Sequence, residues 1–396
     1  MVRIIQAVAL LTMAVAGLAA PTKKGPVTLS MTRFNKNPSW RNAVKSDKAR
    51  IDSFPKTHLK KRTTSLPAVN EDFSYVVTVG VGSPAQDFTL IVDTGSSNTW
   101  VGAGTTYNPS ASNTSKNTGD SVSVSYGSGS FSGEEYIDTV TLGSLTLTGQ
   151  SIGSASSATG FSGVDGIVGF GPDDLTTGTV SNTGTVPTIV DTAYSEGLIS
   201  SKIIGVSFAP INGSSTIVSN GEITFGGVDS SKYTGSITYI PITSSSPASN
   251  YWGIDVSSIT YGSTSLQSTS VAGIVDTGTT LIYIPDSAYN AFLEATEGSL
   301  DSTTGLVKIP SSSYSGLQNV NFNIGGTTFS LSPAQYIVPQ DQVATFGGSA
   351  GNYYSYISSV GIRTGGVNFI LGQKFLENYY SVYDTDNARV GLATAA

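Results

Sequence analysis

The stretch Ile91-Val-Asp-Thr-Gly-Ser96 is repeated almost unchanged as Ile274-Val-Asp-Thr-Gly-Thr279, with one copy in each half of the 396-residue chain. Asp-Thr pairs occur at three other places, and none of them is followed by glycine. A matched pair of this kind suggests two similar lobes. We therefore expect each lobe to supply one carboxylate, Asp93 or Asp276, to a shared site.

The composition favours a mainly β protein. The chain is rich in Gly, Ser and Thr, only 12% of its residues are charged, and its length allows two domains with substantial cores. Frequent Val, Ile, Thr and Tyr with few helical runs are typical of strands. We expect an N-terminal β lobe over residues 63–240 and a C-terminal β lobe over residues 241–396.

The first 62 residues differ from the rest. Residues 1–20 join one arginine to an apolar run and small residues, which is typical of a secretory signal peptide. A membrane anchor is the alternative, but the run is shorter than the roughly 20 residues of a span. Residues 21–62 hold twelve basic and two acidic residues, show almost no strand pattern, and end in the processing-type cluster Lys60-Lys61-Arg62.

These features predict a secreted protein whose own basic pro-segment, residues 21–62, acts as an intramolecular inhibitor. Lys45, Lys48 or Arg50 can bond the acidic pair and block the site before activation. The alternative is a basic segment that serves only solubility.

The chain beyond residue 62 has no cysteine and no histidine, because the only histidine is His58. Ser-His-Asp and Cys-His mechanisms are therefore excluded, as are zinc sites built on His or Cys. We expect no metal and no cofactor. Seven basic against 25 acidic residues give a formal charge of −18, which argues against a nucleic-acid partner and suits a protein that stays folded in acid.

Strand patterns lead to the first motif and follow it. Alternation over 73–83 and 88–92 predicts a hairpin that delivers Asp93, and alternation around Tyr126-Gly-Ser-Gly129 predicts a second hairpin with a flexible tip. We expect a surface loop over 104–121 and helices within 187–197 and 287–296. An apolar pair followed by glycine recurs at 167–169 and 370–372, so both halves share one order of elements.

Two carboxylates held together by matching turns cannot both ionise easily, so the pair shares one proton. The ionised carboxylate can then take a proton from water while the other protonates a carbonyl oxygen, which is general acid–base hydrolysis of an amide. The neighbouring residues can support this pair through close backbone approach, bonds between the lobes and donation to the outer carboxylate oxygens; they are Thr94, Gly95, Ser96, Thr277, Gly278 and Thr279.

In order along the chain, these motifs resemble those of the pepsin-like aspartic proteases. They are Asp-Thr-Gly-Ser-Ser-Asn-x-Trp at 93–100, Tyr-Gly-x-Gly-Ser at 126–130, Asp-Gly-Ile-x-Gly at 165–169, Tyr-Trp at 251–252, Asp-Thr-Gly-Thr-x-Leu at 276–281 and Ile-Leu-Gly at 370–372. The resemblance covers essentially all of 63–396 and most of the preceding residues. It implies a bilobal β fold, with an active-site cleft between pseudo-symmetric lobes that binds protein and peptide substrates in extended form.

The same resemblance implies a monomeric secreted acid endopeptidase that pepstatin-type inhibitors block. Asp93 and Asp276 would be catalytic, and Thr280 with Gly278 would bond substrate backbone. A flap of Tyr126, Gly127 and Ser128 would close over substrate, with Trp100 bonding the Tyr126 hydroxyl; Ile91, Tyr126 and Ile167 would line the pocket before the scissile bond. Many fungal relatives have Asp where this chain has Ser128, so we expect apolar residues around the cut and poor cleavage after lysine.

Three other functions fit parts of the pattern. Asp-x-Gly-Thr also occurs in phosphate-binding turns of actin-like folds, but this chain repeats the motif and lacks a lysine-rich pocket. An inactive pepsin-like binding or inhibitor protein would usually have lost an Asp, a motif Gly or the flap Tyr, all of which are present. A two-carboxylate glycosidase would leave the Thr-Gly turns unexplained.

Overall fold

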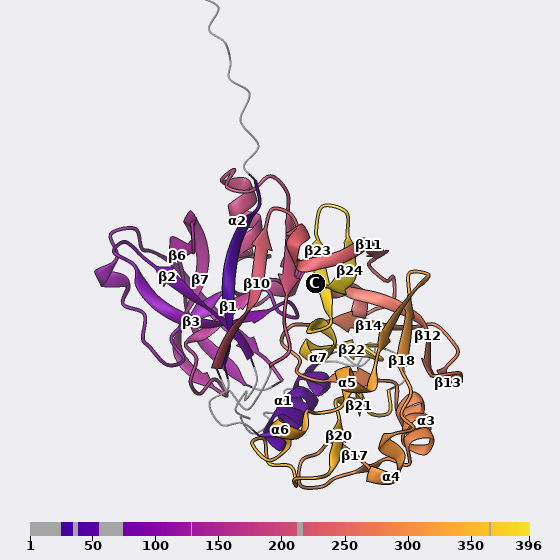
Figure 1. Cartoon of the computed structure of the whole chain (residues 1–396). Helices are drawn as coiled ribbons and strands as arrows, with labels where there is room; N and C mark the ends of the chain where they lie inside the picture. Colours follow the sequence, from indigo (N-terminus) through magenta and orange to yellow (C-terminus); the bar gives the residue numbers. More distant parts are fainter. Residues whose placement is uncertain (1–24, 35–38, 55–73, 128, 212–216, 364–365) are drawn as a thin grey trace, which may run out of the picture.

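The computed structural model describes residues 25–34, 39–54, 74–127, 129–211, 217–363 and 366–396. Figure 1 shows the early strands on one side, the elements from about residue 250 to 360 on the other, and the last two strands between them. Helix α1 (Trp40–Ser53) lies against both parts. The predicted signal peptide lies outside the described residues. None of the helices in those ranges combines the length and apolarity that crossing a bilayer requires.

The largest sheet has 13 strands drawn from the whole chain. In spatial order they are β11 (Tyr233–Pro241), β24 (Arg389–Ala395), β23 (Tyr379–Asp384), β9 (Ile203–Ser207), β10 (Ile217–Phe225), β1 (Val27–Phe34), β2 (Ser74–Val81), β3 (Gln86–Asp93), β8 (Gly166–Gly169), β4 (Trp100–Val101), β7 (Leu145–Thr159), β6 (Ser130–Leu142) and β5 (Lys116–Ser125). Because its strands come from both halves, the lobe boundary at residues 240 and 241 stays a prediction.

The second half forms its own sheets. An eight-stranded sheet contains β19 (Thr327–Leu331), β18 (Val320–Ile324), β12 (Gly253–Tyr261), β14 (Val271–Val275), β22 (Ile370–Leu371), β15 (Ile282–Ile284) and β21 (Ile357–Ser359), with β13 (Thr264–Gln267) beside β12. A three-stranded sheet contains β16 (Ser299–Leu300), β17 (Val307–Ile309) and β20 (Tyr353–Ser355). The remaining α-helices are α2 (Ile189–Ser195), α3 (Asp286–Thr296), α4 (Ser311–Tyr314), α5 (Pro333–Tyr336), α6 (Gln340–Val343) and α7 (Gln373–Leu376).

The two motifs end equivalent strands. Strand β3 pairs with β2 in the predicted hairpin and runs parallel to β8, so that Asp93 lies opposite Gly169. In the second half, β14 runs parallel to β22, with Val275 opposite Leu371. In each half, the recurrent apolar pair that precedes a glycine therefore lies in the strand beside the Asp-Thr-Gly motif. The shared order of elements was a correct prediction, and so were the two helices, α2 and α3. The loop expected over 104–121 was partly wrong, because β5 begins at Lys116.

The predicted pro-segment is more regular than its composition indicated. We found almost no strand pattern in 21–62, yet β1 pairs with β10 on one side and β2 on the other, in the middle of the large sheet. The basic composition hid an alternation in which Met31 and Arg33 point inward and are fully buried. Arg33 is accommodated there because its Nη1 lies 2.7 Å from the carboxylate of buried Glu377.

Glu135 gives the first half a pH-dependent stability. Its side chain is buried in β6, where Ser151 donates to one oxygen at 2.5 Å and the other oxygen has no partner among the described residues. Burial raises the pKa of Glu135 to about 7, above the 4.5 of an exposed glutamate. The folded protein therefore binds the extra proton, and its stability falls as the pH rises from 4.5 to about 7.

We expect Glu135→Gln to remove this part of the pH dependence, on the order of 3 kcal/mol between mildly acid and alkaline conditions. Thermal unfolding measured at both ends of the window should show a smaller difference in Tm for the variant than for the wild type. Glu134→Gln on the same strand is the matched control, because Glu134 is exposed. An unchanged Tm difference in Glu135→Gln would contradict the assignment.

Candidate active site

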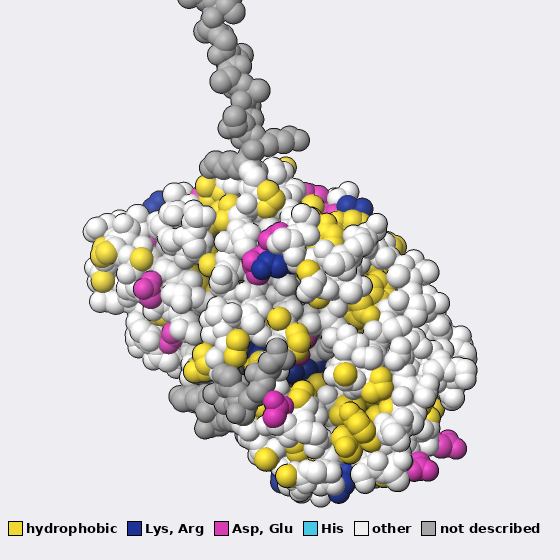
Figure 2. Space-filling view, viewed as in Figure 1, with side chains coloured by type: hydrophobic (Ala, Val, Ile, Leu, Met, Phe, Trp, Pro, Cys, Tyr) yellow, Lys and Arg dark blue, Asp and Glu magenta, His cyan; other side chains and the backbone are white. Residues whose placement is uncertain are grey.

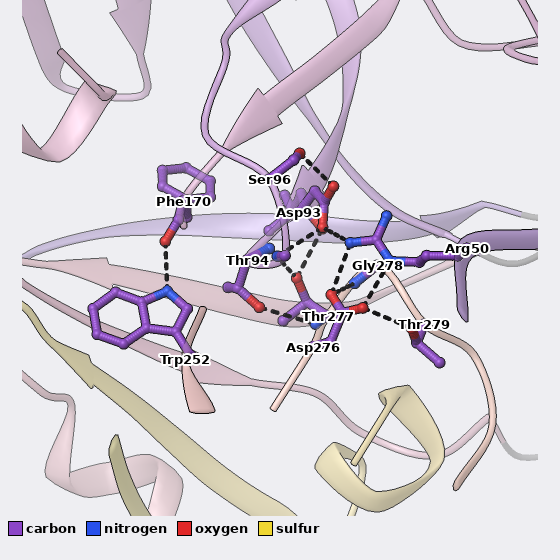
Figure 3. A network of polar contacts seen from close by, with 12 residues as sticks. Arg50, Asp93, Thr94, Ser96, Phe170, Trp252, Asp276, Thr277, Gly278 and Thr279 are labelled. Carbon is purple, nitrogen blue, oxygen red and sulfur yellow. Dashed lines mark hydrogen bonds and ion pairs between the residues drawn. The ribbon is translucent and has the colours of Figure 1, made fainter. Parts of the chain in front are cut away.

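The two aspartates meet at the junction of the halves. Both are fully buried, and one nitrogen, Nη2 of Arg50, lies 2.5 Å from Oδ1 of Asp93 and 3.0 Å from Oδ1 of Asp276. The two Oδ1 atoms are therefore separated by no more than the sum of these distances. Figure 3 shows the carboxylates facing each other across this guanidinium. The juxtaposition predicted from the repeated hexapeptide is confirmed.

Each carboxylate is held by its own turn in the same way. Gly95 N–H donates to Oδ1 of Asp93 at 2.9 Å, and Gly278 N–H donates to Oδ1 of Asp276 at 3.0 Å. The opposite oxygens accept from hydroxyls, with Ser96 at 2.5 Å from Asp93 and Thr279 at 2.6 Å from Asp276. Only one oxygen of each acid then faces the other acid, which leaves a defined pair for proton transfer.

The two glycines allow the turns to approach. A Cβ on Gly95 would lie 2.7 Å from Oδ1 of Asp276, and one on Gly278 would lie 2.5 Å from Oδ1 of Asp93. Real Cβ atoms are not found so close to such oxygens, so any larger residue would push the carboxylates apart. Glycine is required here for the close approach of the two halves.

The motif threonines lock the halves together. Thr94 N–H donates to the Thr277 hydroxyl at 2.9 Å, Thr277 N–H donates to the Thr94 hydroxyl at 3.0 Å, and the Thr277 hydroxyl donates to the Val92 carbonyl at 3.0 Å. Thr94 and Thr277 are both fully buried. The predicted bond between the two loops is thus a reciprocal pair that fixes one carboxylate relative to the other.

We expect Thr277→Val to lower both stability and kcat. Valine keeps the shape but leaves Thr94 N–H and the Val92 carbonyl without partners, at about 1–3 kcal/mol for each buried group. Thermal unfolding should show a lower Tm, and steady-state assays on a peptide should show a lower kcat. Thr277→Ser retains the hydroxyl and should recover most of both losses; equal behaviour of the two variants would mean that the hydroxyl does not matter.

Contacts behind the turns complete the support, and the sequence did not single them out. Gln373, at the start of α7, donates from Nε2 to the Thr277 carbonyl at 2.9 Å and from its backbone N–H to the Thr279 carbonyl at 2.8 Å. On the other side, Trp252 Nε1 donates to the Phe170 carbonyl at 2.9 Å (Figure 3). The sequence signal was that Trp252 belongs to the recognised Tyr-Trp motif, while Gln373 and Phe170 directly follow the Ile-Leu-Gly and Asp-Gly-Ile-x-Gly motifs.

The predicted pro-segment occupies the site through Arg50. Its Nε lies 2.7 Å from Oδ2 of Asp276, in addition to the two Nη2 contacts. Burial by itself would lower the pKa of Arg50, but the charges of Asp276 and Asp93 raise it well above its usual value. Of the three candidates from the sequence, the structure selects Arg50, because Lys45 and Lys48 are exposed on α1.

A second residue of α1 occupies a predicted substrate position. Asp47 accepts from the backbone N–H groups of Thr280 and Leu281, both at 2.9 Å. Burial raises the pKa of Asp47 to about 6, although these two donors lower it. Thr280, which we expected to bond the substrate backbone, therefore bonds the chain's own N-terminal segment through its N–H.

The flap hairpin rests directly on α1. Strands β5 and β6 form the second predicted hairpin, and a Cβ on Gly127 would overlap the backbone of Arg50. The expected bond from Trp100 to the Tyr126 hydroxyl is not formed, since Trp100 Nε1 has no hydrogen-bond partner among the described residues. The rings of Trp100 and Tyr126 instead lie roughly parallel, with centroids 6.4 Å apart. In this arrangement α1 fills the space under the flap. Ser128 lies outside the described residues.

The expected pocket residues come together beside the flap. Ile91 lies opposite Ile167 across the β3–β8 pair, and Trp100 lies opposite Ile167 across the β4–β8 pair. All three are buried in one apolar cluster, against which the half-buried Tyr126 packs. The structure brings these predicted residues into contact with one another; which of them touch substrate stays a prediction.

The paired turns, the shared guanidinium and the flap define the site of an aspartic protease, and comparison with known proteins identifies the family. The model of the eukaryotic aspartyl protease family matches residues 74–395. The chain belongs to the pepsin-like aspartic proteases and is an aspartic-type endopeptidase, a hydrolase.

Individual relatives agree with this assignment. The chain is 53% identical to polyporopepsin of Irpex lacteus over 335 residues, covering 84% of this chain and 97% of that protein. It is 34% identical to pepsin A of Sus scrofa, with 82% of each protein covered. A crystal structure of the aspartic proteinase from Irpex lacteus matches with a TM-score of 0.80 and 47% identity, covering 94% of this chain and 98% of that one.

Proposed function

We propose that this chain is the zymogen of a secreted acid endopeptidase, in which Asp93 and Asp276 activate a water molecule between them. The observation that carries the proposal is the mirrored pair of buried carboxylates, whose Oδ1 atoms share one hydrogen-bond donor. No histidine, cysteine or metal is needed for this reaction. The general acid and general base are the two members of the pair.

The support of each acid explains how the pair divides its tasks. Each Oδ1 faces the other acid, so two charges there repel and one proton is shared. The ionised partner removes a proton from water as the oxygen attacks the peptide carbon, and the protonated partner donates to the carbonyl oxygen. The aspartate that took the water proton then gives it to the leaving nitrogen, while the other aspartate takes a proton back from a hydroxyl of the tetrahedral intermediate. The carbonyl re-forms and the C–N bond breaks, without a covalent intermediate between enzyme and substrate.

Substrate would bind where α1 now lies. An extended peptide can use the Thr280 N–H that Asp47 occupies and the space under Gly127 that the Arg50 backbone fills. The cluster of Ile91, Trp100 and Ile167 offers an apolar wall beside the flap. We therefore propose a preference for apolar side chains around the scissile bond, with Gly278 and Thr280 bonding the peptide backbone.

Residues 21–62 would act as an inhibitor that acid releases. Arg50 binds both catalytic acids, and Arg33 of β1 pairs with Glu377 in the large sheet. Protonating the catalytic carboxylates removes the charges that hold Arg50. We propose that this loss opens the cleft and that cleavage near Lys60-Lys61-Arg62 makes the change permanent.

The surface fits an enzyme that works outside the cell in acid. Charged side chains are few on the face shown in Figure 2, most of which is uncharged. With only seven basic side chains beyond residue 62, protonation of the carboxylates leaves little positive charge to repel itself. We propose secretion after removal of residues 1–20 and action as a monomer, with neither nucleic acid nor a membrane as a partner.

The proposal is tested by hydrolysis of casein after the full chain is brought to about pH 3–4, where a shared-proton pair is active. We expect cleavage that pepstatin abolishes and that appears together with loss of the N-terminal segment. Sequencing the first residues of the active form locates the processing site. Absence of pepstatin-sensitive cleavage would favour the alternative, an inactive pepsin-like binding or inhibitor protein.

A further inference from the structure

The C-terminal end of α1 is a stretch of peptide that lies in the cleft, so its contacts indicate which enzyme side chains a bound substrate would meet. Arg50 touches the catalytic acids, and the ring of Phe54 lies edge-on to that of Tyr251 with centroids 5.1 Å apart. Between Arg50 and Phe54 in the sequence, Ile51 and Asp52 both contact the guanidinium of Arg363. Arg363 follows β21 in the second half of the chain.

The contacts of Arg363 are made mainly to the segment that activation would remove. Its Nη2 donates to the Ile51 carbonyl and lies 3.8 Å from a carboxylate oxygen of Asp52. Its Nε donates weakly to the Val360 carbonyl, at 3.4 Å. Nη1 is buried and has no hydrogen-bond partner among the described residues. Once α1 leaves, the Val360 contact is the one hydrogen bond of the Arg363 side chain that stays among the described residues.

The surroundings of Arg363 are unusual for an arginine whose only role is to stabilise the fold. The Arg363 side chain is 4% exposed with α1 in place, so the guanidinium is largely removed from water. Asp52 is 58% exposed and too far away for a good hydrogen bond, so it compensates the charge poorly. Burial accordingly lowers the pKa of Arg363, although Asp52 raises it. A buried cation with a free donor calls for a carboxylate partner.

Cations are scarce in the rest of the chain. Arg363 and Arg389 are the only arginines after residue 62. Arg389 has an internal partner, since its Nε lies 2.7 Å from buried Asp384 and its guanidinium stacks on Tyr239. Among the described residues beyond 62, no carboxylate pairs with Arg363, which lies beside the peptide segment that carries Arg50.

We propose that Arg363 is a specificity residue of the active enzyme, which binds an acidic side chain of the substrate within a few residues of the scissile bond. The guanidinium would donate to a substrate carbonyl, as it does to Ile51, and direct Nη1 to the carboxylate of a neighbouring Asp or Glu. This rests on the proposed endopeptidase function and adds to it a preference for peptides that combine apolar residues at the cut with one acid nearby.

The experiment compares matched peptides that differ by Glu or Gln at one position at a time, over four residues on either side of one scissile bond. Their C-termini are amidated, so that only the side chain offers a carboxylate. The full chain is activated in acid and assayed at about pH 5, where a free glutamate is mostly ionised. Mass spectrometry confirms that the cut stays at the same bond.

We expect one position at which the wild type prefers Glu over Gln by about tenfold or more in kcat/KM, as for a hydrogen bond to a charged group. Arg363→Gln should bring this ratio near one, and Arg363→Glu should reverse it in favour of Gln at that position, because like charges repel. Arg363→Lys keeps the charge and should retain part of the preference. Lys116→Gln, which removes an exposed positive charge elsewhere, should keep the full ratio.

Two results would overturn the inference. One is a wild type without a preference for Glu at any position. The other is a preference that persists in Arg363→Gln. A wild type that cuts neither peptide of any pair would instead contradict the endopeptidase function, and with it this inference, so the two failures are distinguishable.

Discussion

Asp276→Asn is expected to lower kcat/KM on a peptide substrate by about 10²–10⁴-fold, the usual contribution of a general acid or base. Asparagine fills the same volume. Its one oxygen can accept from Gly278 N–H, whose bond to Asp276 is 3.0 Å long, and its amide nitrogen can donate to the Thr279 hydroxyl, which lies 2.6 Å from Asp276. It cannot carry or release the shared proton. Asp93→Asn should have an effect of the same size, because the two acids have equivalent surroundings.

The assay needs an enzyme freed from its N-terminal segment, which an inactive variant cannot do for itself. Cutting the zymogen at Lys60-Lys61-Arg62 with a protease specific for basic residues, followed by acid, supplies it. Asp255→Asn is the matched control, since Asp255 lies exposed on β12. If Asp276→Asn kept its Tm and more than a tenth of the activity, the two-aspartate mechanism would be wrong.

Arg50→Gln is expected to make the uncut zymogen active at a pH where the wild type is silent. Removing one partner of a buried ion pair costs about 3–5 kcal/mol, because the remaining charges lose their compensation. The population with an open cleft should then rise by roughly 10²-fold or more. Initial rates on a fluorogenic peptide at about pH 6, with gels to show that the chain is still whole, measure this.

Lys48→Gln is the matched control for Arg50→Gln. Lys48 lies on the same helix two residues earlier, is exposed, and carries the same charge. Its replacement should leave the zymogen as silent as the wild type. If both uncut variants lacked activity, the helix would block the cleft by its volume alone, and the ion pairs to Asp93 and Asp276 would be dispensable for inhibition.

Lowering the pH affects the docking of α1 through Asp47 in the opposite sense from the release that we propose. The pKa of Asp47 is about 6 with the helix in place and 3.8 for an exposed aspartate, so the docked helix binds the extra proton. Between these values, lowering the pH strengthens docking through Asp47. The release in acid that we propose therefore depends on groups other than Asp47.

The amino-acid sequence alone was enough to predict that Asp93 and Asp276 lie together, that the protein is mainly β, and that hairpins lie around the two acids. These follow from short-range signals: a hexapeptide repeated in both halves, alternation over strands such as β2 and β3, and glycines at turns. Predictions from such signals were correct because each turn is determined by neighbouring residues and does not depend on where its lobe lies. The strand β1 was missed, since the basic composition of residues 21–62 as a whole outweighed the alternation within β1 itself.

Only the tertiary structure decided which basic residue meets the acids and what surrounds it. Arg50 and Asp276 are 226 positions apart, and Arg363 lies 312 positions from Ile51. No spacing or composition selects Arg50 over Lys45 or Lys48. The choice depends on which face of α1 turns toward the cleft, and that face is set by burial of one side of the helix between the two halves. Contacts of this kind exist only after the chain has folded back on itself.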